Sequence, residues 1–203
     1  MNKDYMQYIE VPEEKNERLK WAYKMLNIKG KLIDKIEEEI KKIRKAKKNK
    51  EIIEMTFYIV PEGIARPRKG WNGKFYVPNI QKFYDIMDSY IIKHKELENL
   101  KIFTEFKMGL KYYLPMPKDM NKVQKILAER KFITNIKKPD WDNLGKGTDM
   151  LARIMINDSL ATDVRVRKFY SFKPRIEVRL VYYKDHTNSY HKKIIEKLLK
   201  KGS

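Results

Sequence analysis

The chain has 203 residues, of which 42% are hydrophobic and 36% charged, so it is long and apolar enough to fold around its own core. Its 46 Lys and Arg residues outnumber 27 Asp and Glu, and the net charge of +19 favours a polyanionic partner, although a merely Lys-rich surface has the same composition. The absence of cysteine excludes disulfides, thiolate zinc sites and a cysteine nucleophile. No apolar run approaches the roughly 20 residues that span a bilayer, and the polar N-terminus is unlike a signal peptide, so we expect a soluble, cytoplasmic protein.

Residues 12–48 predict two helices that precede the core. Pro12 and the two glutamates after it suit a first helical turn, and Gly30 breaks a run of apolar residues at helical spacing. The second run is amphipathic and ends in the basic stretch KKIRKAKKNK. We expect residues 1–50 to form a helical N-terminal extension, and the alternative is a helical docking element for another protein.

Apolar side chains occupy most positions of residues 51–60, which predicts a strand that is buried on both faces. The Asn72-Gly73 pair further on is a hairpin turn signal, since both residues tolerate positive φ. The hairpin arms mix aromatic side chains with basic ones, including Arg66, Arg68 and Lys69. This mixture suits contact with a nucleic-acid backbone, and an ordinary exposed hairpin explains it equally well.

The remainder of the chain contains both helical and alternating patterns. Helices are predicted over residues 79–97, 117–130, 142–154 and 190–200. Strands are predicted over residues 101–114, 164–172 and 175–183. Because strands and helices do not alternate strictly, the predicted fold class is α+β, with a core at residues 51–185 and a basic C-terminal helix at 186–203.

The most informative segment is KKPDWDNLGK, residues 137–146. Residues two apart in an extended chain project to the same side, so Asp140 and Asp142 can face one cation. A helix from Asp142 places Lys146 one turn further, and the chain can fold back after it to return Asp158 to the pair. Clustered carboxylates repel one another unless a hard cation binds, and oxygen-only ligands favour Mg²⁺ or Mn²⁺. The pattern is typical of a phosphodiester-cleaving site in which the lysine offsets charge on the phosphate.

On spacing alone, ordinary structural roles are favoured for the same residues. Asp140 or Asp142 can cap a helix, and Asn157-Asp158-Ser159 is a common turn sequence. Lys146 is then one more solvated lysine.

A longer string resembles the signature of the RusA-like Holliday junction resolvases. The resemblance covers about residues 53–183 and rests on KPDWDNLGK at 138–146, the DML segment at 149–151, Asn157-Asp158, the basic strand at 164–168 and PRIEV at 174–178. It implies a mixed β-sheet flanked by helices and a homodimer that binds four-way DNA junctions. Such an enzyme nicks two opposed strands with magnesium, in DNA recombination and repair.

Carried over to this sequence, the resemblance makes Asp140, Asp142 and Asp158 the metal-binding acids and Lys146 the catalytic lysine. The sequence departs from the family at Asn157, where an acid is usual. A non-catalytic DNA-binding protein that retains the fold is therefore the alternative. The residues expected to contact DNA, mostly its backbone, are Arg66, Arg68, Lys69, Lys137, Lys138, Arg165 and Lys168.

Overall fold

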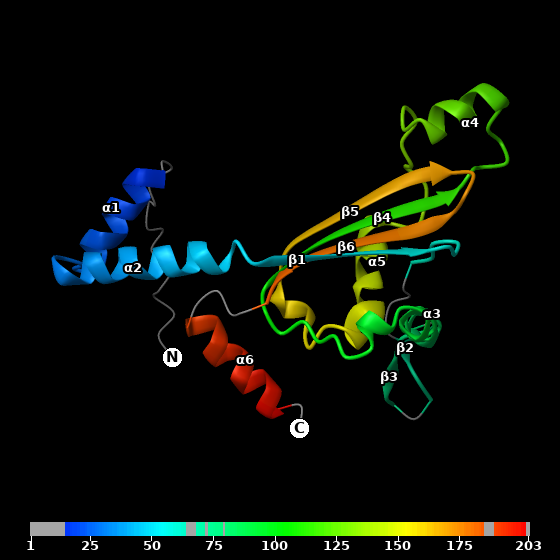
Figure 1. Cartoon of the computed structure of the whole chain (residues 1–203). Coiled ribbons are helices and arrows are strands. Elements are labelled where there is room, and N and C mark those ends of the chain that lie inside the picture. The colour runs from blue at the N-terminus through cyan, green and yellow to red at the C-terminus, as the bar shows by residue number, and fades with distance from the viewer. Residues whose placement is uncertain (1–14, 64–67, 72, 79, 185–188, 202–203) are drawn as a thin grey trace. The chain divides into compact units, whose positions relative to one another are not determined.

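The computed structural model describes residues 15–63, 68–71, 73–78, 80–184 and 189–201 (Figure 1). The chain divides into two compact units, Met1–Lys45 and Ala46–Ser203. The second unit includes the C-terminal helix, which the sequence set apart as a segment of its own. Within the described residues, no helix combines the length and the apolar character that a membrane crossing requires.

The first unit is a pair of helices, as the sequence predicted. Helix α1 (Lys15–Met25) and helix α2 (Lys31–Ala46) are separated by a turn in which Asn27 has φ 48° and Gly30 has φ 50°. Asn and Gly tolerate this left-handed conformation better than other residues, which explains why the helical run breaks there. The described part of α2 has no fully buried side chain, although its isoleucines form one amphipathic stripe.

A mixed four-stranded sheet forms the centre of the second unit, which confirms the predicted α+β class (Figure 1). Its strands are β1 (Lys50–Phe57), β4 (Phe106–Pro115), β5 (Ala161–Ser171) and β6 (Arg175–Tyr183), in the order β1-β6-β4-β5. Strands β4 and β5 are parallel, whereas β6 pairs antiparallel with both β1 and β4. A parallel pair needs a long connection, and residues 116–160 supply it.

The two faces of the sheet differ, because successive side chains of a strand point to opposite sides. One face, here called the core face, is apolar and belongs to the hydrophobic core, to which α3 (Ile80–Lys93) contributes the buried Phe83 and Met87. The core face consists of Met55, Phe57, Phe106, Met108, Leu110, Tyr112, Leu114, Ile176, Val178 and Leu180. The other face, here called the open face, is mainly polar and carries Glu54, Thr56, Lys107, Gly109, Lys111, Tyr113, Asp163, Arg165, Arg167, Arg175, Glu177 and Arg179, together with the apolar Ile52, Phe169 and Val181.

Shorter elements complete the second unit. Strands β2 (Arg68–Lys69) and β3 (Phe75–Tyr76) pair antiparallel, with Gly73 at φ 76° in the turn, so the predicted hairpin is confirmed. Helix α6 (Ser189–Lys201) buries Ile195. The single-turn helices are η1 (Lys95–Leu97) and η3 (Asp158–Leu160).

Several predicted elements differ from the structure. Strand β1 ends at Phe57 rather than at 60, and it is not buried on both faces, since Ile52 is 44% exposed. Strand β4 begins at Phe106 rather than at 101, and the helix predicted over 117–130 is the shorter α4 (Lys122–Glu129), which starts after the capping residue Asn121. The apolar face of α4 is largely exposed, with Val123 at 68% and Ile126 at 54%. The helix predicted over 142–154 is split into α5 (Trp141–Gly145) and a tighter 3-10 helix, η2 (Lys146–Arg153).

Candidate functional site

The acidic loop, residues 137–142, is fixed at its start by a side chain of the edge strand β5. The ammonium group of Lys168 donates hydrogen bonds to the main-chain oxygens of Lys137 and Pro139, each at 3.1 Å. Lys168 is half-buried and lies on the core face of β5. It therefore holds the two residues on either side of Lys138 immediately before the first carboxylate of the loop, Asp140.

The end of the acidic loop is fixed by α5. The main-chain NH of Leu144 donates to the oxygen of Asp140 at 3.1 Å, and the Leu144 side chain is fully buried. The hydroxyl of Tyr112, on β4, donates to the main-chain oxygen of Leu144 at 2.6 Å. Burial raises the pKa of Tyr112 well above its ordinary value, so this hydroxyl remains protonated and keeps its role as donor.

A close approach of backbone brings the segment after β1 against the same loop. A Cβ atom on Gly63 would lie 3.1 Å from the Cβ of Asn143 and 3.2 Å from that of Pro139, which is tighter than most Cβ contacts and would require these neighbours to shift. Gly63 therefore lies directly beside the acidic loop, five residues before Arg68 in the sequence. Arg66 itself lies outside the described residues, and Arg68 is exposed on β2.

Asp158 is the first residue of η3, at the end of the connection that returns the chain to β5. The side chain of Asn157 caps this turn by accepting a hydrogen bond from the main-chain NH of Ser159 at 2.8 Å. The segment before it is tied to Ile102, whose NH donates to the oxygen of Ile154 at 2.7 Å. Asn157 thus has a local structural role that an aspartate could also perform.

The three acids differ in solvent exposure, and the structure does not gather them into one site. Asp140 and Asp158 are exposed, whereas Asp142 is half-buried in the first turn of α5. Across the described side chains, no group of three or more His, Cys, Asp or Glu is arranged to hold a metal ion. Lys146 begins η2, but its side chain lies outside the described part of the structure. The metal site therefore stays a prediction.

The side chain of Asn143, which follows Asp142 in α5, was not among the site residues that the sequence predicted. The side-chain oxygen of Asn143 is buried and has no hydrogen-bond partner among the described residues, a condition shared there only with Asn135. A buried unpaired amide oxygen is costly, and an amide oxygen is also a ligand that hard divalent cations accept. With carboxylates on Asp140 and Asp142, the loop offers the donor types that such a cation prefers. The signal in the sequence was the asparagine directly after the D-x-D pattern.

The lysines and arginines expected to contact DNA do not form one patch. Lys137 pairs with Asp119, Nζ to Oδ2 at 3.1 Å, and this hydrogen bond lowers the pKa of Asp119. Lys138 is exposed beside it, but Arg165 lies on the open face of the sheet, where it pairs with Asp163 at 3.3 Å. Lys69 lies with Arg68 on the β2–β3 hairpin. The structure therefore divides these residues among the acidic loop, the hairpin and the open face.

The sequence of this chain is similar to those of known proteins. The sequence matches the family model described as "Endodeoxyribonuclease RusA" over residues 59–181. A protein of Bacillus subtilis (strain 168) with the name "Uncharacterized protein YqaN" is 34% identical over 135 residues, which are 63% of this chain and 94% of that protein. The family match contains the acidic loop, Lys146 and Asp158, and it lies entirely within the second compact unit.

Proposed function

Because this chain belongs to the RusA endodeoxyribonuclease family, we propose that it is a magnesium-dependent endonuclease that resolves four-way DNA junctions by paired nicks. The resemblance found in the sequence is confirmed by the family match, which covers residues 59–181. The proposed setting is DNA recombination or repair in the cytoplasm. The net charge of +19 supports a polyanionic substrate.

Three carboxylates and one lysine carry the proposed chemistry. Asp140, Asp142 and Asp158 would hold Mg²⁺ or Mn²⁺, and Lys146 would offset negative charge on the phosphate. The support is the family match and the donor type, since carboxylate oxygens are the ligands that these ions prefer. When bound, the ion would act as a Lewis acid and would lower the pKa of a water molecule coordinated to it.

The observation that carries the proposal is the rigid support of the acidic loop. Lys168 holds its first residues from β5, and Tyr112 holds the main chain of α5 from β4. Asp140 and Asp142 therefore project from a segment that is fixed at both ends by the sheet. A backbone that is fixed in this way lowers the ordering cost when the substrate binds.

A homodimer belongs to this proposal. A four-way junction has near two-fold symmetry, and paired nicks on opposed strands need two sites related in the same way. One chain carries a single acidic loop, so a second copy would supply the second site.

The test is cleavage of a synthetic four-way junction with and without Mg²⁺, for the wild type, Asp142→Asn and the control Asp34→Asn. Asp34 is an exposed acid of α2, outside the family match. We expect metal-dependent nicking by the wild type and the control, and a loss of at least about 100-fold for Asp142→Asn with junction binding retained. No nicking by the wild type, or equal nicking by Asp142→Asn, would contradict the proposal. Salt-sensitive binding without nicking would instead support a non-catalytic DNA-binding protein.

A further inference from the structure

The open face of the sheet carries a shallow groove of about 290 Å³ above β4, on the side opposite the core face. It is not part of the acidic loop, and most of its lining was not singled out by the sequence. The charged side chains that line it are Glu54, Lys111, Arg165, Arg167, Glu177 and Arg179.

A glycine makes this groove hollow. Gly109 pairs with Arg165 on β5 and with Arg179 on β6, so two arginines flank a position without a side chain. A Cβ atom on Gly109 would meet only the main-chain oxygen of Arg179, at 4.0 Å. The space above Gly109 is therefore open, and its lateral walls are guanidinium-bearing side chains.

The basic side chains around Gly109 form only weak, solvent-exposed ion pairs. Arg179 pairs with Glu54 at 3.2 Å and Arg165 with Asp163 at 3.3 Å, and three of these four side chains are more than half exposed. Exposed pairs of this kind contribute only about 0–1 kcal/mol, so an incoming anion can replace them at little cost. Arg167 forms no ion pair or hydrogen bond within the described residues, and it stands next to Lys111 across the parallel β4–β5 pair.

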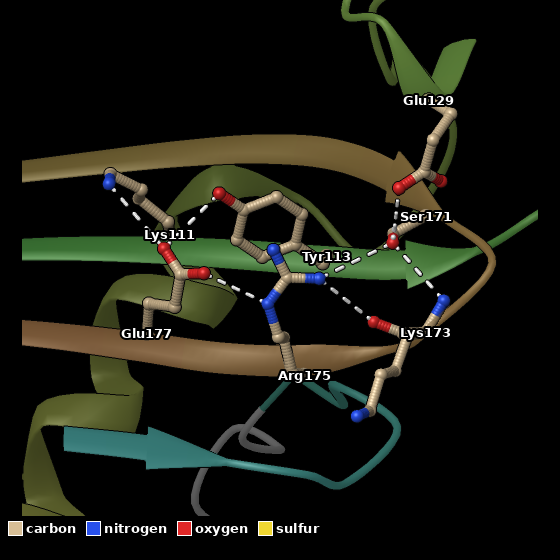
Figure 2. A network of polar contacts seen from close by, with 7 residues as sticks. All are labelled: Lys111, Tyr113, Glu129, Ser171, Lys173, Arg175 and Glu177. Atoms are coloured by element: carbon tan, nitrogen blue, oxygen red, sulfur yellow. Dashed lines mark hydrogen bonds and ion pairs between the residues drawn. The ribbon is translucent and has the colours of Figure 1, made fainter. Parts of the chain in front are cut away.

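One end of the groove is organised by the network in Figure 2. The carboxylate of Glu177 accepts from Arg175 at 2.9 Å and from the hydroxyl of Tyr113 at 3.2 Å, and the Arg175 guanidinium lies 3.6 Å from the Tyr113 ring centre. Burial raises the pKa of Glu177, but Arg175, Tyr113 and Lys111 together outweigh it and hold that pKa below its usual value. The Glu177 carboxylate is thus already paired with Arg175 and Tyr113. Its contact with Lys111, at 3.4 Å, is the longest of these three polar contacts.

We propose that this groove seats the phosphodiester backbone of a DNA arm, so that the sheet holds DNA on the face opposite the acidic loop. Arginine forks match phosphate oxygens in geometry, and four cations face two carboxylates along the lining. A second copy of this chain is a poorer occupant, since two such faces would oppose cation to cation. The inference rests on the proposed DNA substrate but not on cleavage.

The edge strand β5 connects the groove to the acidic loop. Arg167 and Lys168 are consecutive, so their side chains leave β5 on opposite faces. Arg167 lines the groove, while Lys168 binds the main chain of the acidic loop. A DNA strand that passes around this edge can reach both places, as one arm of a branched substrate would.

The test places a side chain at Gly109, where the backbone has no positive φ and the space is open. Binding of a four-way junction and of a linear duplex is measured in EDTA across a salt series, for Gly109→Glu, Gly109→Lys and Gly109→Ala. We expect Gly109→Glu to weaken binding at least about 10-fold with a shallower salt dependence, and Gly109→Ala and Gly109→Lys to bind within about twofold of the wild type or more tightly. Arg167→Gln should reduce the salt slope by about 1.

Equal binding by Gly109→Glu and the wild type would overturn the groove assignment alone, whereas no DNA binding by the wild type would overturn the proposed function as well. Thermal melting of each variant separates lost binding from lost folding, and Arg167→Gln tests the groove even if Gly109→Glu fails to fold. Sedimentation gives the oligomeric state. A change from dimer to monomer in Gly109→Glu would make this face a contact between copies and would also overturn the inference.

Discussion

The ammonium group of Lys168 donates a hydrogen bond to the main-chain oxygen of Pro139 at 3.1 Å, which links the edge strand to the residue before Asp140. The sequence predicted a DNA contact for this lysine. The structure gives it an internal role first, since a second hydrogen bond goes to the oxygen of Lys137. Lys168 therefore acts on the acidic loop by positioning its main chain.

Lys168→Met should disturb the acidic loop more than it disturbs the fold. Each lost hydrogen bond involves a charged donor, so we expect a loss of about 1–3 kcal/mol in the free energy of unfolding. Cleavage of a four-way junction should fall by more than junction binding does. Melting, binding and cleavage measured together check this, with Lys93→Met on α3 as the matched control. Reduced binding with an unchanged cleavage rate would instead indicate direct phosphate contact.

Tyr112→Phe should destabilise the second unit, because it removes the donor to the buried main-chain oxygen of Leu144. A buried acceptor left unpaired costs about 1–3 kcal/mol, and the loss should appear in urea unfolding. The matched control is Tyr58→Phe, since Tyr58 is 65% exposed. Equal stability of the wild type and Tyr112→Phe would show that the hydroxyl contributes nothing to holding α5.

The same tyrosine should make stability fall at alkaline pH. Because burial raises the pKa of Tyr112 in the folded chain, its contribution is complete below the unfolded value of about 10 and is lost as pH rises above it. Unfolding measured between pH 8 and pH 11 should therefore show a steeper decline for the wild type than for Tyr112→Phe. Parallel curves would contradict this assignment.

Asn157→Asp should leave the fold unchanged and strengthen metal binding. An aspartate at this position can accept the hydrogen bond from the Ser159 NH, as Asn157 does at 2.8 Å, and it adds a carboxylate beside Asp158. Calorimetric titration with Mn²⁺ should show tighter binding than in the wild type. Asn157→Ala is the control for the cap and should cost about 0.5–2 kcal/mol of stability. Weaker Mn²⁺ binding by Asn157→Asp would argue against a metal at this position.

Removal of residues 1–45 should leave a folded protein that still binds and nicks junction DNA. The second unit contains the family match, and the buried hydrophobic residues of the described chain all lie at position 55 or beyond. Circular dichroism, sedimentation and the cleavage assay on the truncated chain check this. Loss of the dimer on truncation would assign the first unit to assembly, in line with a docking role for its helices.

Local signals made much of the fold predictable. The break at Gly30 and the Asn72-Gly73 turn depend on the conformational freedom of those residues, which the sequence shows directly. Strand β6 (Arg175–Tyr183) was predicted with the bounds that the structure has, because its alternation is regular and Lys173-Pro174 precedes it. Such features need no knowledge of distant contacts.

The remaining features depend on contacts that sequence patterns do not encode. The apolar stripe of α4 predicted burial, but in the structure only Ala128 of that helix is buried. The role of Lys168 depends on main-chain oxygens 29 and 31 residues away, and the closeness of Gly63 to Asn143 joins segments 80 positions apart. The groove around Gly109 exists because two arginines on different strands share its register. These features could not be predicted because sequence patterns do not show which strands pair with each other or in which register.

The parallel pairing of β4 with β5 has a consequence for local unfolding. Asp140, Asp142 and Asp158 all belong to the single connection that leaves β4 at Pro115 and enters β5 at Ala161. Fraying of the edge strand would free the start of the acidic loop from Lys168, while α5 would stay tied to β4 through Tyr112 and the order β1-β6-β4 could persist. Asp142 is thus anchored through β4, whereas Asp158 directly precedes β5, and a ligand that bridged these two acids would also fasten the start of the edge strand to α5.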